Sequence, residues 1–185
     1  MNHVTLASDD RDRPLAALAR NRLADALGAS DIALNHYRVP LGERLAGLHA
    51  HDDQAEIFVC LDGTMTFETL DGECTLRTGE AVRFAPGEFQ SGKNDGDATA
   101  TVLAIGTPRD TGALRVPVAC CSCGNDRTEP RVRGGETVLA CPACGHESVV
   151  ECPECGSGDV RAELGQGGAE PVSVCQECGN SWAAR

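Results

Sequence analysis

The chain has 185 residues, which is room for one ordinary domain and some smaller units. Hydrophobic residues make up 41% and charged residues 24%, a balance that excludes a disordered or fibrous protein. The formal net charge is −12, and the sequence has no basic patch that could neutralise a row of phosphates, which argues against nucleic acid as the main partner. No apolar run approaches the ~20 residues of a membrane span, and the N-terminus lacks a signal peptide's apolar core. We therefore expect a cytoplasmic protein with no membrane partner.

The basic residues are almost all arginine, with Lys93 the single lysine among 16. Acid excess, scarce lysine and abundant glycine lead to the hypothesis of a halophilic source. In molar salt the Debye length is ~3 Å, so long-range electrostatic steering would be screened. Function should then depend on contact chemistry.

The N-terminal segment, residues 1–30, carries the pattern of one amphipathic helix. Asp12 and Pro14 give a start signal and Gly28 a stop signal. The apolar positions between them are Leu15, Leu18, Ala19, Leu23, Ala26 and Leu27. We expect this helix to pack against the edge of a sheet.

Residues 31–108 read as a series of short strands with no helix between them. The predicted strands are Ile32–Val39, Ile57–Leu61, Thr64–Leu70, Cys74–Arg77, Ala81–Ala85 and Ala98–Ile105. Asp-Gly turns separate several of them, and five of the six aromatic residues lie between Tyr37 and Phe89. Closely spaced hairpins of this kind predict a small antiparallel β-barrel with its core in this region.

One cluster within the predicted barrel has metal-ligand character. His49 and His51 are one residue apart, so on a strand both imidazoles face the same side. Glu56 adds a carboxylate. Two histidines and a carboxylate supply three ligands and leave other positions open, as redox and hydrolytic metals require when a substrate must also bind.

These residues resemble the cupin superfamily over about residues 32–106. The first cupin motif is matched by His49, His51, Glu56 and Gly63, and the second by Gly79, Gly87 and Asn94, with Pro86 one place late. The resemblance implies a double-stranded β-helix, that is, a cupin-type antiparallel β-barrel whose site lies in its mouth. It also implies a homodimer. It does not imply one reaction, because cupins include dioxygenases, isomerases, decarboxylases, sugar-binding regulators and storage proteins.

Gln90 stands where the family has a third histidine. An amide oxygen is a weaker donor than imidazole for late transition metals, so affinity should fall. Gln90 could ligate, could hold a metal-bound water, or could mark a site that has lost its metal. We expect His49, His51, Glu56 and Gln90 to hold one divalent ion: Fe, Mn, Ni or Zn.

The other residues around this cluster are predicted to have structural roles. The aromatic side chains could wall a pocket but are more typical of core: Tyr37, Phe58, Phe67 and Phe84. Four charged side chains read as solvated: Asp52, Asp53, Arg83 and Glu88. Cys60 and Cys74 lie in apolar strand patterns and are expected in the core.

Eight of the 11 cysteines form four Cys-x-x-Cys pairs, and a glycine follows each pair. The pairs are Cys120/Cys123, Cys141/Cys144, Cys152/Cys155 and Cys175/Cys178. Two residues between the ligands let a tight turn aim both sulfurs at one ion, and the glycine permits the close backbone. The gaps between pairs are 17, 7 and 19 residues, and each long gap can hold a hairpin.

The spacing predicts two tetrahedral four-cysteine zinc sites in series, each pairing two knuckles across a hairpin. Disulfides and a rubredoxin-type iron site are the alternatives. The segment resembles the zinc ribbon family. We expect a linker at 109–118, a first zinc ribbon at 119–149 and a second at 150–185. Cys121 is expected to be a spectator and His146 to be exposed.

The sequence supports a metal-binding cupin with two structural zinc ions and a small-molecule ligand or substrate. It leaves open whether the protein is an enzyme or a ligand-sensing adaptor that contacts a protein partner through its ribbons. Nucleic-acid binding by the ribbons is disfavoured, because residues 117–185 carry five arginines against ten acids.

Overall fold

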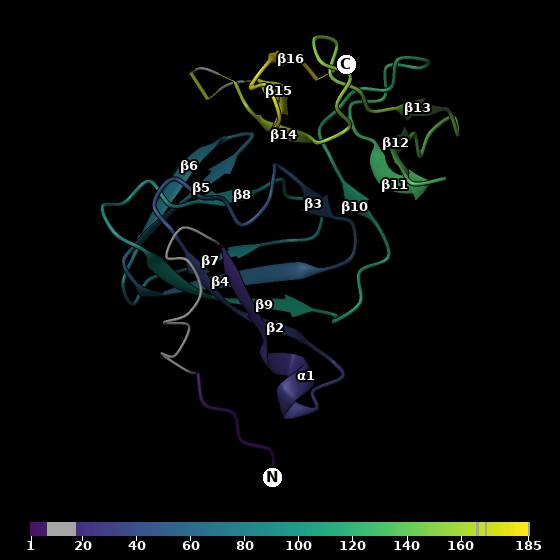
Figure 1. Cartoon of the computed structure of the whole chain (residues 1–185). Helices are drawn as coiled ribbons and strands as arrows, with labels where there is room; N and C mark the ends of the chain where they lie inside the picture. Colours follow the sequence, from purple (N-terminus) through teal and green to yellow (C-terminus); the bar gives the residue numbers. More distant parts are fainter. Residues whose placement is uncertain (7–17, 166, 169, 185) are drawn as a thin grey trace.

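The computed structural model describes residues 1–6, 18–165, 167–168 and 170–184. Two facing sheets make up the larger part of the molecule, and the C-terminal ribbons lie together at one end of it (Figure 1). No helix in the described ranges is long and apolar enough to cross a membrane.

The first sheet has five strands in the order β1-β2-β9-β4-β7. These strands are β1 (Ala19–Arg22), β2 (Ala33–Val39), β4 (Ala55–Asp62), β7 (Ala81–Phe84) and β9 (Ala100–Thr107). All neighbouring pairs are antiparallel. The opposing sheet has the order β6-β5-β8 and is built from β5 (Thr64–Thr69), β6 (Gly72–Arg77) and β8 (Ser91–Lys93).

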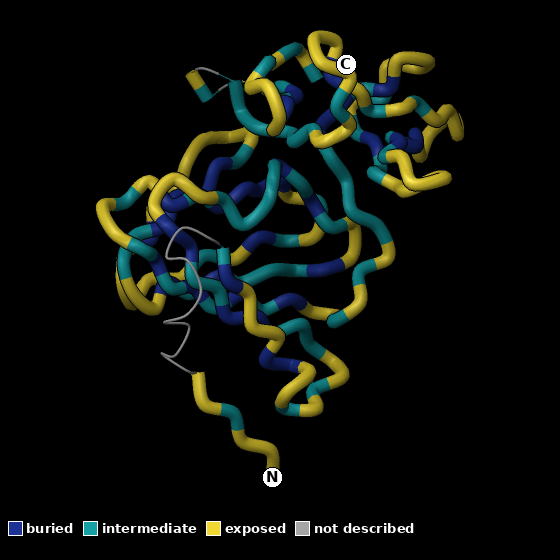
Figure 2. Tube along the Cα trace, in the orientation of Figure 1, coloured by how far each residue is buried: buried dark blue, intermediate teal, exposed yellow. Residues whose placement is uncertain are grey.

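The main core fills the space between these two sheets, where Figure 2 shows the buried segments. Phe58, Phe67 and Phe84 are mutually packed, with ring centroids 4.7 to 6.0 Å apart. Phe67 and Cys60 have no exposed surface, so Cys60 is a core residue as predicted. Cys74 is exposed on β6, and its predicted burial is wrong because its side of that edge strand faces solvent.

The six predicted strands of this region are confirmed, but the two sheets do not close into a barrel. At the seam, β3 (Ala50–His51) pairs with β10 (Leu114–Arg115), not with either large sheet. Single bridges, Arg44 to Lys93 and His49 to Gln90, are the residual contacts there. Isolated backbone hydrogen bonds, such as the two exchanged by His49 and Gln90, take the place of a continuous ladder at this seam, so the two sheets are not closed there.

The predicted N-terminal helix is largely wrong in the part that the structure describes. Ala19–Arg22 is strand β1, paired with Asn35–Arg38 of β2, and the helix α1 is limited to Leu23–Leu27. The free edge of β2 provides hydrogen-bond partners that outweigh local helix propensity. Gly28 ends the helix in a left-handed conformation, as its stop signal predicted. The start signal at Asp12 and Pro14 lies outside the described residues.

The C-terminal region forms two small three-stranded sheets. The first contains β11 (Glu129–Arg133), β12 (Glu136–Ala140) and β13 (Glu147–Val149), and the second contains β14 (Val160–Leu164), β15 (Pro171–Cys175) and β16 (Ser181–Ala183). The predicted hairpins are present in both, with the first turn at Gly134-Gly135. The connector predicted as a linker includes β10.

The second ribbon packs directly on the two-sheet domain. The amide of Leu48 donates to the carbonyl of Ala162 at 2.7 Å, and Arg44 lies 3.5 Å from Glu163. Ala162 and Leu164 of β14 cover a small apolar cluster of Leu48, Ala50 and Phe89. The backbone segment around His49 is thus held from the ribbon side.

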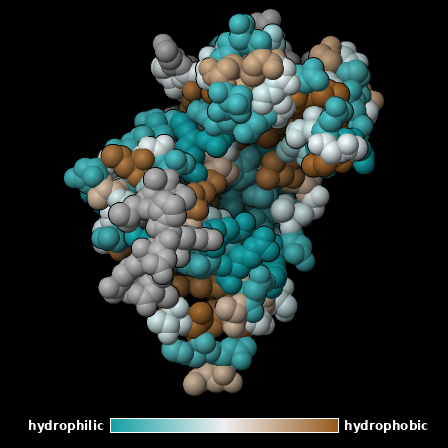
Figure 3. All heavy atoms as spheres, viewed as in Figure 1, coloured by the Kyte–Doolittle hydropathy of each residue, from teal (hydrophilic) through white to brown (hydrophobic). Residues whose placement is uncertain are grey.

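Polar side chains cover much of the face in Figure 3 and separate the hydrophobic patches.

Candidate functional site

His49, His51 and Glu56 come together at the open seam between the sheets. One possible ligand atom from each lies within 4.8 Å of the others. The Nε2 atom of His51 is 3.6 Å from Glu56 Oε2, and that of His49 is 4.0 Å from the same oxygen. Nitrogen and oxygen ligands about 2.0–2.2 Å from a shared ion lie roughly 3–4 Å apart, so this spacing fits one metal ion.

Backbone and side-chain acceptors orient both imidazoles. His49 Nδ1 lies 2.7 Å from the carbonyl of Gly47, which can only accept, so Nδ1 carries the proton. His51 Nδ1 lies 3.2 Å from Thr111 Oγ1, and that hydroxyl donates to Asp53 Oδ1 at 2.8 Å. Both Nε2 atoms therefore carry a free lone pair on the side of Glu56. This is the tautomer that a metal ion requires.

The electrostatics of the site favour neutral imidazole at His51. Burial lowers the pKa of His51 below its usual range, although the Glu56 carboxylate acts in the opposite direction. Hydrogen bonds from Thr111 and from the amide of Gly112 lower the pKa of Asp53, so the acceptor at the end of the chain stays ionised. A neutral histidine with a fixed outer proton is ready to ligate a cation.

Gln90 is buried next to these three residues. Its Nε2 donates to Glu56 Oε2 at 2.8 Å and lies 3.3 Å from His49 Nε2. In this arrangement the amide positions the carboxylate rather than offering its oxygen to a metal. A half-turn of the amide would present Oε1 at the same place.

A cavity of about 290 Å³ opens above the cluster. Tyr37 and Phe58 line it, whereas Phe67 belongs to the core alone. Arg83 and Glu88, the charged residues that flank the second motif, do not line it, and Glu88 instead accepts the amide of Ala85. The cavity has the size of a site for a small molecule that would reach the open side of a metal ion.

Several residues of the site could not be recognised in the sequence. Asp53, predicted to lie in a solvated loop, holds Thr111 and Gly112, and Asp52 accepts from Arg115 at 2.8 Å. Thr111 lies 60 residues from the His51 that it contacts. No local motif signals such a contact, which depends on β10 pairing with β3.

Each ribbon brings its four cysteine sulfurs together in the pairing that the gaps predicted. The closest sulfurs are 3.6 to 3.7 Å apart within each cluster. Zn–S bonds of about 2.3 Å in a tetrahedron would place them about 3.8 Å apart, so both clusters could hold zinc. All 11 cysteines are free, and no disulfide forms.

The four knuckles repeat one backbone design. In the first, the amide of Gly124 donates to the carbonyl of Cys120, whose own amide donates to Asn125. The same two bonds recur at the other three pairs, and all four glycines have φ of 73° or 74°. In the second ribbon, burial acts to raise the pKa of Cys152, but backbone amides of Cys155 and Glu154 lower it to about 6. A backbone hydrogen bond from Ser157 acts to lower the pKa of Cys155, but the sulfur of Cys178 and burial outweigh it and raise that pKa to about 12. Cys121 and His146, both exposed, lie 3.2 Å apart beside the first cluster.

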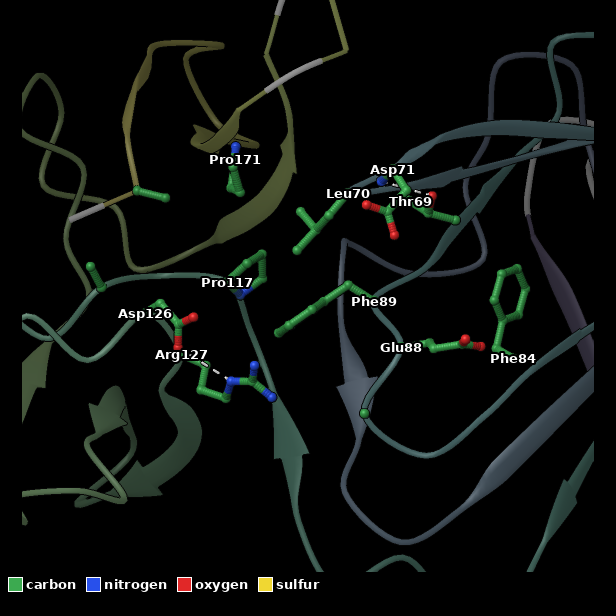
Figure 4. A pocket seen from close by; sticks show the side chains of 13 residues that line it. Thr69, Leu70, Asp71, Phe84, Glu88, Phe89, Pro117, Asp126, Arg127 and Pro171 are labelled. Atoms are coloured by element: carbon green, nitrogen blue, oxygen red, sulfur yellow. Dashed lines mark hydrogen bonds and ion pairs between the residues drawn. The ribbon is translucent and has the colours of Figure 1, made fainter.

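A larger cleft of about 640 Å³ lies between the two-sheet domain and the ribbons (Figure 4). Phe89 projects into it towards Pro117, and the Arg127 guanidinium lies 5.6 Å from the centre of the Phe89 ring. None of the candidate metal ligands lines this cleft, so it is separate from the cavity above Glu56.

Comparison with known proteins finds a family model that matches the two-sheet region. A family model described as Cupin domain matches residues 35–106 and ends before the cysteine pairs. A candidate sugar phosphate isomerase from Acidithiobacillus ferrooxidans is similar in structure, with a TM-score of 0.55 and 22% identity over 74% of this chain and 90% of that one. None of the curated proteins compared with the sequence matches it.

Two further solved structures have lower scores. A sugar phosphate isomerase of the cupin superfamily from Silicibacter pomeroyi has a TM-score of 0.49 and 23% identity over 71% of this chain and 76% of that one. A predicted oxalate decarboxylase from Thermotoga maritima has a TM-score of 0.45 and 22% identity over 49% of this chain and 80% of that one. The family model describes residues 35–106 as a Cupin domain and the first of these structures shares the fold, so we call these residues the cupin domain.

Proposed function

We propose that the cupin domain holds one divalent metal ion through His49, His51 and Glu56, and that this centre binds a small organic molecule. The single observation that carries the proposal is the convergence of two Nε2 lone pairs on one carboxylate oxygen, at 3.6 and 4.0 Å, below an open cavity. When bound, the metal would supply Lewis acidity or redox chemistry.

The residues of this chain have distinct tasks in that site. Gly47 and Thr111 fix the two imidazoles through Nδ1, and Gln90 holds Glu56 in place. Tyr37 and Phe58 exclude water from one wall of the cavity. Three protein ligands leave coordination positions free for the small molecule, which both an enzyme and a ligand sensor would need.

We propose a structural role for the two ribbons, each with one zinc ion. The sequence offered them as contact surfaces for a protein partner, yet β14 of the second ribbon already packs on the cupin domain through Ala162 and Leu164. A cytoplasmic location, a homodimer and an external protein partner stay predictions.

Metal content measured by mass spectrometry on protein purified without chelator tests this proposal. Wild type should carry close to three metal ions per chain, and the double variant His49→Ala/His51→Ala should carry two zinc ions. The exposed His3, changed to alanine, is the matched control and should retain three. Two zinc ions in both wild type and double variant would contradict a metal centre in the cupin domain.

Turnover separates an enzyme from a sensor once the third metal is identified. We would offer the metal-replete protein a panel of small hydroxy acids, keto acids and sugar phosphates. An enzyme should form product that the double variant does not form. A sensor should bind a member of the panel in a metal-dependent way without product.

A further inference from the structure

The edge strand β1 places arginines on the cavity side of the large sheet. Arg20 is directly opposite Tyr37 in the register, and Arg22 is directly opposite Asn35. Residues directly opposite each other on antiparallel strands project from the same face. Because Tyr37 and Asn35 line the metal-site cavity, Arg20 and Arg22 project to that side as well.

Small residues separate these arginines from the candidate metal ligands. The cross-strand row through Glu56 continues to Gly106 and Ala33, and Ala104 is opposite Asn35 in the next row. With three steps of about 4.8 Å between β4 and β1, a molecule bridging metal and guanidinium would lie over these small side chains. The side chain of Gln54, which also lines the cavity, lies over Gly106 and donates to the carbonyls of Pro108 and Arg109, so a bridging molecule would pass beside this amide.

A second, more polar cavity of about 200 Å³ extends this space outward. It shares Arg20, Asn35 and Arg109 with the metal-site cavity and adds Arg22. Both cavities therefore carry guanidinium groups, and each also carries carboxylates: Glu56 in the first, and Asp25 and Asp110 in the second.

The Arg20 side chain is oriented by its neighbours. Its Nε donates to Asn35 Oδ1 at 2.9 Å, and its guanidinium carbon lies 5.8 Å from the centre of the Tyr37 ring. Within residues 18–165, no carboxylate lies within 4.0 Å of a nitrogen of Arg20 or Arg22, whereas Arg109 pairs with Asp25. Asp25 and Ala29 hold Arg109, so Arg20 and Arg22 are the groups best placed for a ligand.

We propose that Arg20 and Arg22 form a subsite for the anionic end of the molecule that the metal centre binds. Guanidinium presents paired N–H donors that match the oxygens of a phosphate or carboxylate group. The ligand class is a small organic molecule with a phosphate or carboxylate at one end and an oxygen function for the metal at the other. This inference rests on the proposed metal centre for its second half, but the anion subsite itself is built from β1 and β2.

Isothermal titration with inorganic phosphate, and separately with acetate, tests the subsite in low-salt buffer on the full chain. Arg20→Gln should weaken binding about 10-fold or more, as expected for loss of a hydrogen bond to a charged group, and Arg22→Gln should weaken it in the same direction. The matched control is Arg38→Gln. Arg38 is on β2 opposite Ala19, on the other face of the same sheet, and its loss should change binding less than 2-fold. A stronger loss for phosphate than for acetate would assign the subsite to phosphorylated ligands, and the reverse to carboxylates.

The His49→Ala/His51→Ala variant separates the two proposals. Anion binding that persists in this variant and falls in Arg20→Gln supports the subsite, whatever the metal content of the cupin domain. The proposal is overturned if wild type binds neither anion, if Arg20→Gln binds like wild type, if Arg38→Gln loses as much, or if binding disappears with the two histidines. Arg20→Lys keeps the positive charge but loses the paired N–H donors of guanidinium, so its affinity for the anion should lie between those of wild type and Arg20→Gln. Hydrogen-exchange protection of β2 and β9 at the wild-type level verifies that the two-sheet domain of each variant is folded.

Discussion

The cupin domain and the ribbons differ in how their candidate metal ligands relate to the hydrophobic core. In each ribbon four sulfurs surround one point, and the buried apolar groups outside the cysteines are few, such as Val138 and Ala140 in the first. In the cupin domain a dense core of aromatic and aliphatic residues holds two sheets together, and three ligands lie at their open seam. We therefore expect each ribbon to need its proposed zinc ion in order to fold, and the two-sheet domain to fold on its core and leave coordination positions free at its site.

The largest effect should follow from breaking a closed site. Cys152→Ser removes one of four ligands from the second ribbon, where zinc binding supplies about 10–16 kcal/mol of apparent free energy that is also folding free energy. Strands β14 to β16 should lose their hydrogen-exchange protection, and zinc should fall to one ion per chain in the ribbons. Cys121→Ser, which changes an exposed cysteine outside the predicted ligands, should retain both. Unchanged zinc in Cys152→Ser would refute the assignment.

Truncation of a core side chain should destabilise the cupin domain and leave the first ribbon intact. Phe67 is fully buried between Phe58 and Phe84, and Phe67→Ala should cost about 3–5 kcal/mol through lost packing and a cavity. Denaturant unfolding followed by hydrogen exchange should show the loss in β4, β5 and β9, while the first ribbon keeps its protection and its zinc. Equal loss of protection in the first ribbon would show that the two regions fold as one unit.

The contact between the regions is expected to limit their independence. A Cβ at Gly47 would lie 2.4 Å from Arg161 Cγ and 2.9 Å from the Ala162 carbonyl, so Gly47→Ala should push β14 away at a cost of about 1–3 kcal/mol. Because the Gly47 carbonyl also orients His49, affinity for the cupin metal should fall while both ribbon zinc ions stay. Gly158→Ala, where the nearest atom is 3.4 Å away, should change neither. Competition with a metal chelator provides the readout.

An effect no larger than that of Gly47→Ala concerns a buried charge network beside this contact. Burial alone would raise the pKa of Glu68, but hydrogen bonds from Arg44 and Lys93 lower it below the usual range. A lowered folded pKa stabilises the protein above the ordinary carboxyl value of about 4.3, and that stability is lost as the pH falls through the folded value. Glu68→Gln should lower stability at neutral pH by about 1–3 kcal/mol and flatten its decline in acid.

Unfolding free energies between pH 3 and 7 measure this contribution. Glu73→Gln is the control, since its side chain is 53% exposed and lies farther from Lys93, at 3.6 Å. If the unfolding free energy of Glu68→Gln falls as steeply in acid as that of wild type, another group controls the acid dependence of stability.

The features that could be predicted from the sequence depend on interactions between residues close together in the chain. The knuckles depend on four-residue turns and a following glycine, and the cysteine pairing emerged as predicted. The His49, His51 and Glu56 cluster also depends on local spacing within one strand-turn-strand unit. The six predicted strands carried enough β-forming residues to be recognised.

The missed features depend on distant partners. Ala19–Arg22 lies in an apolar spacing typical of a helix, but the vacant edge of β2 makes it a strand. This change places Arg20 at the metal-site cavity and Arg22 at the second cavity beside it. Thr111 reaches His51, and Asp53 can hold it there, only because β10 pairs with β3. Neither pairing leaves a signal in the local sequence, so the support of the site could not be predicted.

The contrast between a three-ligand site with free coordination positions and two four-cysteine sites is tested most directly by anomalous X-ray diffraction. Data would be recorded from crystals of the metal-replete protein at the absorption edges of zinc, iron, nickel and manganese. We predict three peaks per chain. Two zinc peaks should each be surrounded by four cysteine sulfurs, and the third peak should contact His49, His51 and Glu56 and carry at least one non-protein ligand. Two zinc peaks with none at the cupin seam, or a third ion fully enclosed by protein atoms, would contradict the account.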